Sequence, residues 1–195
     1  MPRTLIAASL LLLTLCGTAL KAQTLDGEAA LRESLATALW PGDIVRLADQ
    51  YRQRYPDGPA AASATLWRER AAESQRVLSR NDVRLHRAAF SPASADASDP
   101  TVSDLRQAAL GDREAAVRLA RQYQHAKRAG ADGDAMANRY VGWLQYASQL
   151  GSERASYELA LHFRRDAQPV LASKYENLAL ALGYQPPVAL DNIRK

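Results

Sequence analysis

Apolar residues recur along the chain at the three- and four-residue spacing of amphipathic helices. In the first half, this spacing predicts helices over residues 25–39, 44–55 and about 60–78. Trp40-Pro41-Gly42 is expected to end the first helix, Asp43 to cap the second, and the stretch 56–59 to separate the second from the third. Alanine and leucine dominate the composition and favour helix over strand, so an all-α protein is expected.

The stretch YRQRYPDGPAAASATLWRERA resembles the tetratricopeptide helix hairpins of bacterial envelope proteins, in which a Tyr-Pro turn joins two antiparallel helices. The resemblance covers one hairpin, and a generic helical hairpin is the alternative. It indicates a helical N-terminal region over residues 24–90. Residues 91–100, SPASADASDP, have no apolar period and are interpreted as a linker or hinge, with an ordered surface loop as the alternative.

Two stretches of the second half share one pattern forty positions apart: GDREAAVRLARQY, from Gly111, and GSERASYELALHF, from Gly151. A second helix in each unit ends in Leu-Gly, at Gly151 and, thirty-two positions later, at Gly183. A glycine directly after the last leucine predicts a left-handed helix end, and Asp112 and Ser152 are expected to cap the helices that follow. The chain therefore repeats a helix pair.

These units resemble the Sel1-like repeat family, a relative of the tetratricopeptide repeats, over residues 104–190. The residues that match are Ala115, Leu119, Ala120, Tyr123, Trp143, Ala147 and Gly151 in the first unit and Ala155, Leu159, Ala160, Phe163, Tyr175, Ala179 and Gly183 in the second. The glycine-rich loop of the family is present in the first unit as Gly130 and Gly133 and is absent from the second. The resemblance implies antiparallel helix hairpins stacked as a short right-handed Sel1/tetratricopeptide-like solenoid over residues 101–195, with the N-terminal helices completing the stack.

The first residues have the pattern of a secretory signal peptide. A basic start is followed by the apolar run 4–15, which is too short to anchor in a bilayer, and by the small residues of 17–22. We expect residues 1–22 to be removed near Ala22, which predicts a periplasmic or secreted protein without an integral membrane segment. The only cysteine, Cys16, lies in a sequence that resembles a lipobox except at Leu15, so a lipid anchor at Cys16 is the alternative.

The charges and the reactive residues argue against nucleic-acid binding and catalysis. The net charge of +4 falls to +2 without residues 1–22, and the two signs are interleaved, so no nucleic-acid partner is expected. The sequence has no recognisable catalytic, phosphate-binding or metalloprotease motif, and we expect neither enzymatic activity nor a cofactor. Glu158 and His162 are spaced to share a metal ion, but no third ligand accompanies them. An enzyme would require partners for His125 or His162 from the N-terminal region.

Five side chains are predicted to bind a partner because they lie off the repeated apolar stripe: Arg118, Arg121, Tyr157, Leu161 and His162. The first helices of solenoid units line a concave face, where such residues would form a groove. For Tyr157 and Leu161, packing against a neighbouring repeat or the N-terminal region is the alternative.

The resemblance implies an exported, non-catalytic adaptor that mediates protein–protein interactions in a bacterial envelope or secretion assembly, including exopolysaccharide export. The alternative is a periplasmic module that binds polysaccharide or cell wall by stacking tryptophan and tyrosine rings on sugars. Buried rings at Trp143 and Tyr175 would favour the adaptor, and exposed, aligned rings would favour the sugar-binding module.

Overall fold

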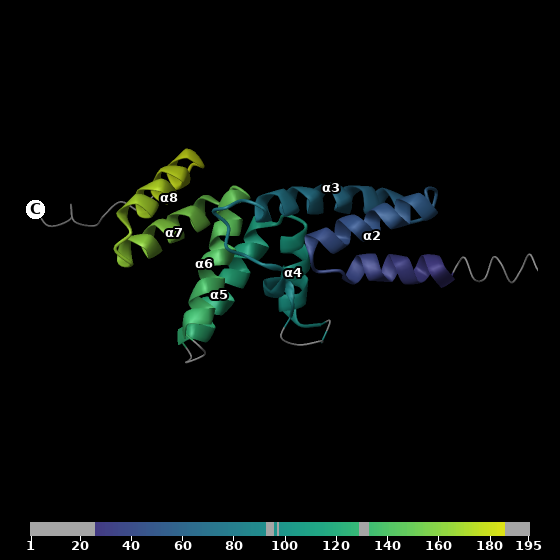
Figure 1. The fold of residues 1–195 in the computed structure, drawn as a ribbon, viewed down its shortest axis with the longest axis horizontal. Helices are drawn as coiled ribbons and strands as arrows, with labels where there is room; N and C mark the ends of the chain where they lie inside the picture. The colour runs from purple at the N-terminus through teal and green to yellow at the C-terminus, as the bar shows by residue number, and fades with distance from the viewer. Residues whose placement is uncertain (1–25, 93–95, 97, 129–132, 186–195) are drawn as a thin grey trace, which may run out of the picture.

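The structure, a computed structural model, describes residues 26–92, 96, 98–128 and 133–185. Within these residues every regular element is a helix, which confirms the all-α prediction (Figure 1). The elements are a helix over 26–37, α2 (Pro41–Arg54), α3 (Ala61–Leu78), the short 3-10 helix η1 (Arg87–Phe90), α4 (Pro100–Ala109), α5 (Arg113–Arg128), α6 (Gly133–Gln149), α7 (Glu153–Arg165) and α8 (Pro169–Ala181).

Consecutive helices pack as hairpins, and the hairpins form a short solenoid. The pairs are α2 with α3, α5 with α6, and α7 with α8, while α4 packs on α5 and α6 packs on α7. Figure 1 shows these pairs following one another along the long axis, with helix 26–37 beside α2 at one end and α8 at the other. The predicted stack of helix hairpins is therefore present.

The N-terminal helices are joined by a buried tyrosine. The Tyr51 hydroxyl donates to the Glu28 carboxylate at 2.6 Å and accepts from the backbone N–H of Ala60 at 3.2 Å, and the Tyr51 side chain is fully buried. These bonds link helix 26–37, α2 and the start of α3. Burial and the bond to Glu28 both raise the pKa of Tyr51, so the phenol stays neutral and keeps its proton for the donated bond.

The expected cap of the second helix was wrong. Helix α2 begins at Pro41, two residues before Asp43, and its N-cap residue Trp40 makes no side-chain capping bond. Proline is favoured in the first turn of a helix because its fixed φ suits that turn and its missing N–H has no helical partner there. Asp43 instead lies in this first turn, near the positive end of the helix dipole, and pairs with Arg87 at 2.7 Å.

The Leu-Gly helix ends have the predicted geometry. Gly111, Gly151 and Gly183 have φ values of 85°, 90° and 93°. At each of them two backbone bonds close the helix; at Gly151 its N–H donates to Ser148 O and the N–H of Ser152 donates to Ala147 O, both at 3.0 Å. This is a Schellman motif, which satisfies carbonyls at the helix end. The predicted caps are also confirmed, because Asp112 and Ser152 accept bonds from the first turns of α5 and α7.

Replacing Gly151 with alanine is expected to lower the free energy of unfolding by about 1 kcal/mol, because a β-carbon is disfavoured at positive φ. The nearest atom to that β-carbon would be 3.7 Å away, so the cost is conformational and not steric. Chemical denaturation measures it. Gly133→Ala is the control, since nothing lies within 4 Å of the added methyl. Equal changes in the free energy of unfolding for the two variants would contradict the left-handed conformation of Gly151.

Aromatic rings fill the space within and between the repeats. Trp143 and Tyr175 are 0% and 1% exposed, and the rings of Phe163 and Tyr175 stack with centroids 5.5 Å apart. Tyr123 differs, because it is only half-buried and lies under the guanidinium of Arg139. Small residues let the helices approach, and at the α6–α7 contact the buried hydroxyls of Ser148 and Ser156 bond to each other at 2.8 Å.

Arg106 joins the N-terminal helices to the repeats. Its guanidinium donates to the carbonyl of Ala38 at 2.5 Å and lies over the ring of Trp67, with Cζ 5.0 Å from the centroid. Burial lowers the pKa of Arg106 to about 10, which still leaves it charged at neutral pH. The contacts connect α4 to the end of helix 26–37 and to α3.

Residues 79–90, here called the strap, lie across the second helix of the first repeat. Val83, Leu85 and Phe90 are buried, although residues 83–86 have no regular secondary structure. The strap runs antiparallel to α6, because its successive residues contact Gln149, then Gln145, then Gly142. The pattern of the sequence did not predict this segment.

Candidate partner-binding surfaces

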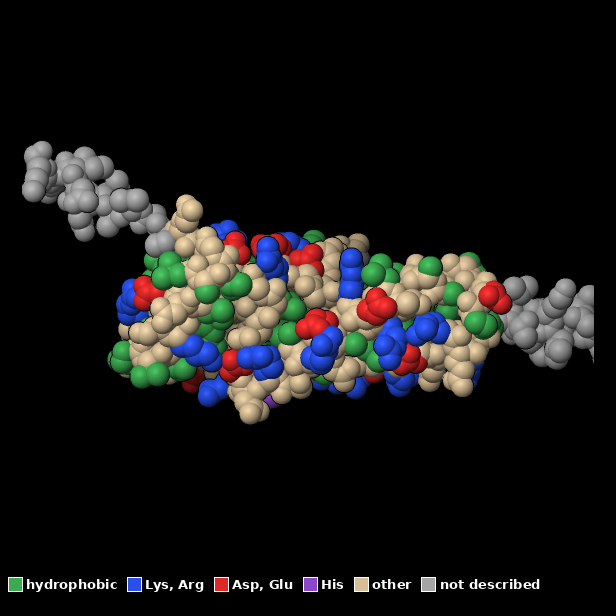
Figure 2. Space-filling view, turned by 90° about the horizontal axis from the view of Figure 1, so that it is seen from above, with side chains coloured by type: hydrophobic (Ala, Val, Ile, Leu, Met, Phe, Trp, Pro, Cys, Tyr) green, Lys and Arg blue, Asp and Glu red, His purple; other side chains and the backbone are tan. Residues whose placement is uncertain are grey.

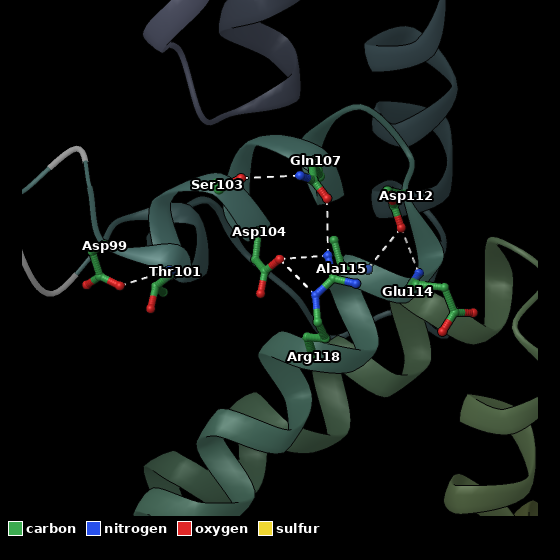
Figure 3. A network of polar contacts seen from close by, with 9 residues as sticks. All are labelled: Asp99, Thr101, Ser103, Asp104, Gln107, Asp112, Glu114, Ala115 and Arg118. Atoms are coloured by element: carbon green, nitrogen blue, oxygen red, sulfur yellow. Dashed lines mark hydrogen bonds and ion pairs between the residues drawn. The ribbon is translucent and has the colours of Figure 1, made fainter.

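Arg118 is held within the molecule by α4. Its Nε and Nη2 donate to one oxygen of Asp104 at 2.9 and 2.7 Å, and Nη2 also donates to Gln107 (Figure 3). The bond that Arg118 donates to Asp104 raises the pKa of Arg118, against the opposing effect of burial. Since the carboxylate of Asp104 is largely buried, the pair is part of the α4–α5 contact.

Arg121 connects the first helices of the two repeats. Its Nη2 lies 3.2 Å from Oε1 of Glu158, which also pairs with Arg154 on the same helix at 3.4 Å. Glu158 therefore has two cationic neighbours, which does not favour the metal site that its spacing to His162 allowed. The described residues contain no group of three or more histidine, cysteine, aspartate or glutamate side chains arranged to hold a metal ion.

Tyr157 and Leu161 lie on the last repeat. The ring of Tyr157 stacks on that of Tyr184, with centroids 4.3 Å apart, so part of its surface is covered by the chain that follows α8. Leu161 is 37% exposed and borders a shallow hollow of about 380 Å³ together with Arg164 and Arg165.

His162 opens onto a different hollow. Its Nε2 lies 3.2 Å from Asp166, and its ring contacts those of Tyr140 and Phe163 edge-on. The hollow has a volume of about 620 Å³ and lies between α6 and α7, with Gln124 of α5 at its edge. The five predicted residues thus occupy separate contacts and do not converge on one groove.

The aromatic residues that would distinguish the two functional hypotheses are both buried. With Trp143 and Tyr175 at 0% and 1% exposure, neither ring presents a face on which a sugar could stack. This is the arrangement expected of an adaptor with rings between its helices.

A groove beside the strap was missed from the sequence. It has a volume of about 260 Å³, an apolar floor and a polar rim. Val141, Phe163, Leu171 and Tyr175 form the floor beside the buried Gln145, and the exposed Arg84, Gln168 and Lys174 lie at the rim. The signal for the strap that borders it was Gly142, because a glycine within a helix costs stability and often marks a close approach of another backbone.

Contacts of its backbone with α6 and an ion pair with α8 hold the strap beside this groove. The N–H of Arg84 donates to Oε1 of Gln145 at 2.9 Å, and a β-carbon at Gly142 would lie only 2.6 Å from the carbonyl oxygen of Arg84. Asp82 accepts from Lys174 at 3.0 Å. Burial alone would raise the pKa of Asp82, but bonds from Arg80 and Lys174 lower it below its ordinary value, so the carboxylate is charged at neutral pH.

None of the described helices is both long enough and apolar enough to cross a membrane. Comparison of the chain with known protein families, with curated proteins and with solved structures finds no match.

Proposed function

We propose that the protein is an exported, non-catalytic helical-repeat adaptor that binds another protein in a bacterial envelope or secretion assembly, with exopolysaccharide export as one such setting. The signal-peptide pattern of residues 1–22 supports export to the periplasm or beyond. The likeness of the repeated units to Sel1-like repeats supports a scaffolding role. The buried rings of Trp143 and Tyr175 support protein binding over sugar binding.

The observation that carries the proposal is the docked strap. Gln145 accepts a hydrogen bond from the backbone N–H of Arg84, and Gly142 leaves room for the carbonyl of the same residue. Helix α6 therefore already binds a stretch of polypeptide that has no regular secondary structure. The groove beside it, at about 260 Å³, is smaller than the roughly 300–1,000 Å³ of typical small-molecule sites. Its size suits one apolar side chain of a second polypeptide segment.

The charges at the rim indicate what that segment carries. Lys174 already forms an ion pair with Asp82. Arg84, in contrast, is exposed, and its guanidinium makes no ion pair with the described residues. An arginine beside an apolar floor complements a segment in which an apolar residue is next to an acidic one.

Arg84→Glu is expected to weaken capture of the partner from an envelope extract by roughly tenfold or more, because it sets a negative charge against the acidic residue of the partner. Thermal melting should be unchanged, since the side chain is exposed. Arg52→Glu, on the exposed surface of α2, is the control and should retain the partner.

If the wild-type chain captures no specific protein, the adaptor proposal fails. If Arg84→Glu and Arg52→Glu capture the partner equally well, the protein binds it elsewhere and the strap groove is not the site.

A further inference from the structure

The strap groove and the hollow at His162 lie along one face of α6. Asp134, Asn138 and Val141 line the hollow, and Val141 and Gln145 line the strap groove. These four residues are spaced by four, three and four positions, which places them in one stripe on a helix. Because Val141 belongs to both depressions, they adjoin there. We call the two together the α6 groove.

Most charged side chains along the α6 groove already have partners within the chain. Figure 2 shows basic and acidic side chains interspersed over one face of the molecule. At the strap end, Lys174 pairs with Asp82, and in the hollow the Nε2 of His162 lies 3.2 Å from Asp166. Arg165, which borders the hollow, donates from Nε to a backbone carbonyl of its own helix.

Two opposite charges remain, one at each end of the α6 groove. Arg84 and Asp134 are exposed, and neither makes an ion pair with the described residues. The backbone of Arg84 contacts Gln145 and Gly142, which lie 8 to 11 positions beyond Asp134. This corresponds to roughly 12–17 Å along a helix. An extended chain covers that distance in about four or five residues.

The strap shows what kind of chain this face of α6 accepts. Residues 83–86 have no regular secondary structure, and Gln145 of the stripe accepts a bond from their backbone. Beyond the strap end, Gln124 and Asn138 line the hollow with amide groups, which can bond to both the N–H and the C=O groups of an extended backbone. Val141 between them offers an apolar contact for the stem of a long side chain.

We propose that the partner segment lies extended along the α6 groove and carries two opposite charges. An acidic residue faces Arg84, the apolar residue next to it fills the strap groove, and a basic residue about four positions away faces Asp134. The proposal rests on the adaptor function proposed above and specifies the segment that the adaptor binds.

The test uses fluorescein-labelled peptides and the purified full chain, with binding followed by fluorescence anisotropy. The matched peptide is Gly-Ser-Glu-Leu-Ser-Gly-Arg-Ser-Gly, and the second peptide has glutamate in place of the arginine. Both are also made in the reverse order, because the two charges do not fix the direction of the segment. In one of the two directions, the wild type should bind the matched peptide roughly tenfold more tightly than the second, since an attraction at Asp134 becomes a repulsion.

Asp134→Lys should reverse this preference. The variant should bind the matched peptide roughly tenfold more weakly than the wild type does, and it should bind the second peptide more tightly than the wild type does. A misfolded variant would lose both peptides, so the reversal is specific to the charge. Asp57→Lys is the matched control, because Asp57 is exposed in the turn between α2 and α3 and should not affect either peptide.

The outcomes separate this inference from the adaptor function. A wild type that binds none of the peptides, or binds both equally, would overturn the inference, and so would an Asp134→Lys variant that keeps the wild-type preference. If Arg84→Glu alone weakens the matched peptide, the strap groove is a binding site and only its extension to Asp134 fails. A reversed preference in a chain that captures no envelope protein would support the binding mode and refute the adaptor.

Discussion

Replacing Trp143 with alanine is expected to lower the free energy of unfolding by about 3–5 kcal/mol, the range for removing a buried large aromatic side chain. Trp143 is fully buried, and its ring lies 4.9 Å from that of Phe90 and 6.0 Å from that of Tyr146, centroid to centroid. The substitution therefore removes packing inside the first repeat and also the ring on which the end of the strap rests.

Urea denaturation measures this effect, and Trp143→Phe is the control. The indole N–H of Trp143 is buried and has no hydrogen-bond partner among the described residues, so phenylalanine gives up packing volume but no hydrogen bond. We expect Trp143→Phe to cost much less than Trp143→Ala. A cost below about 1 kcal/mol for the alanine variant would show that the ring is not part of the core.

Gly142→Ala is expected to lower the free energy of unfolding by about 1–3 kcal/mol, the range for overpacking a filled site. The new β-carbon would lie 2.6 Å from the carbonyl oxygen of Arg84 and 3.1 Å from Leu85 Cδ1, so the strap would have to move away from α6. In an unobstructed helix, the same change stabilises by roughly 0.5–1 kcal/mol. The sign of the effect therefore tests the contact.

Two measurements distinguish strap displacement from a general loss of stability. Denaturation gives the free energy, and limited trypsin digestion reports whether cleavage after Arg84 becomes faster under native conditions. Gly133→Ala, in the open first turn of the same helix, should not lower the free energy of unfolding and should leave the digestion unchanged. A more stable Gly142→Ala variant with unchanged digestion would mean that the strap does not contact α6.

The helices and their ends could be predicted because the determining residues are close together in sequence. The left-handed glycines at 111, 151 and 183 each follow a leucine, and the caps Asp112 and Ser152 come directly after two of them. The start of α2 was misplaced for a local reason too, because Asp43 was favoured as a cap over a proline that suits the first turn equally well.

The candidate surfaces could be predicted only in part, since they depend on contacts between distant segments. Helical periodicity placed Arg118 and Arg121 off the apolar stripe, but it could not show that Asp104 and Glu158 on other helices pair with them. The strap was missed for the same reason, because Arg84 and Gln145 are 61 residues apart. A lone glycine in the pattern of α6 was the available sign of that contact.

The strap also changes how such a stack should fold. Repeats that contact only their neighbours can form and fray one at a time, starting from either end. Here Asp82 is bonded to Lys174, 92 residues later, which closes a loop around α4, α5, α6 and α7. Contacts of the strap with α6 offset part of the entropy lost in closing this loop, and the bond to Lys174 forms only when α8 is in place. The strap and the last hairpin consequently stabilise each other, and the chain gains a cooperativity that an open row of repeats lacks.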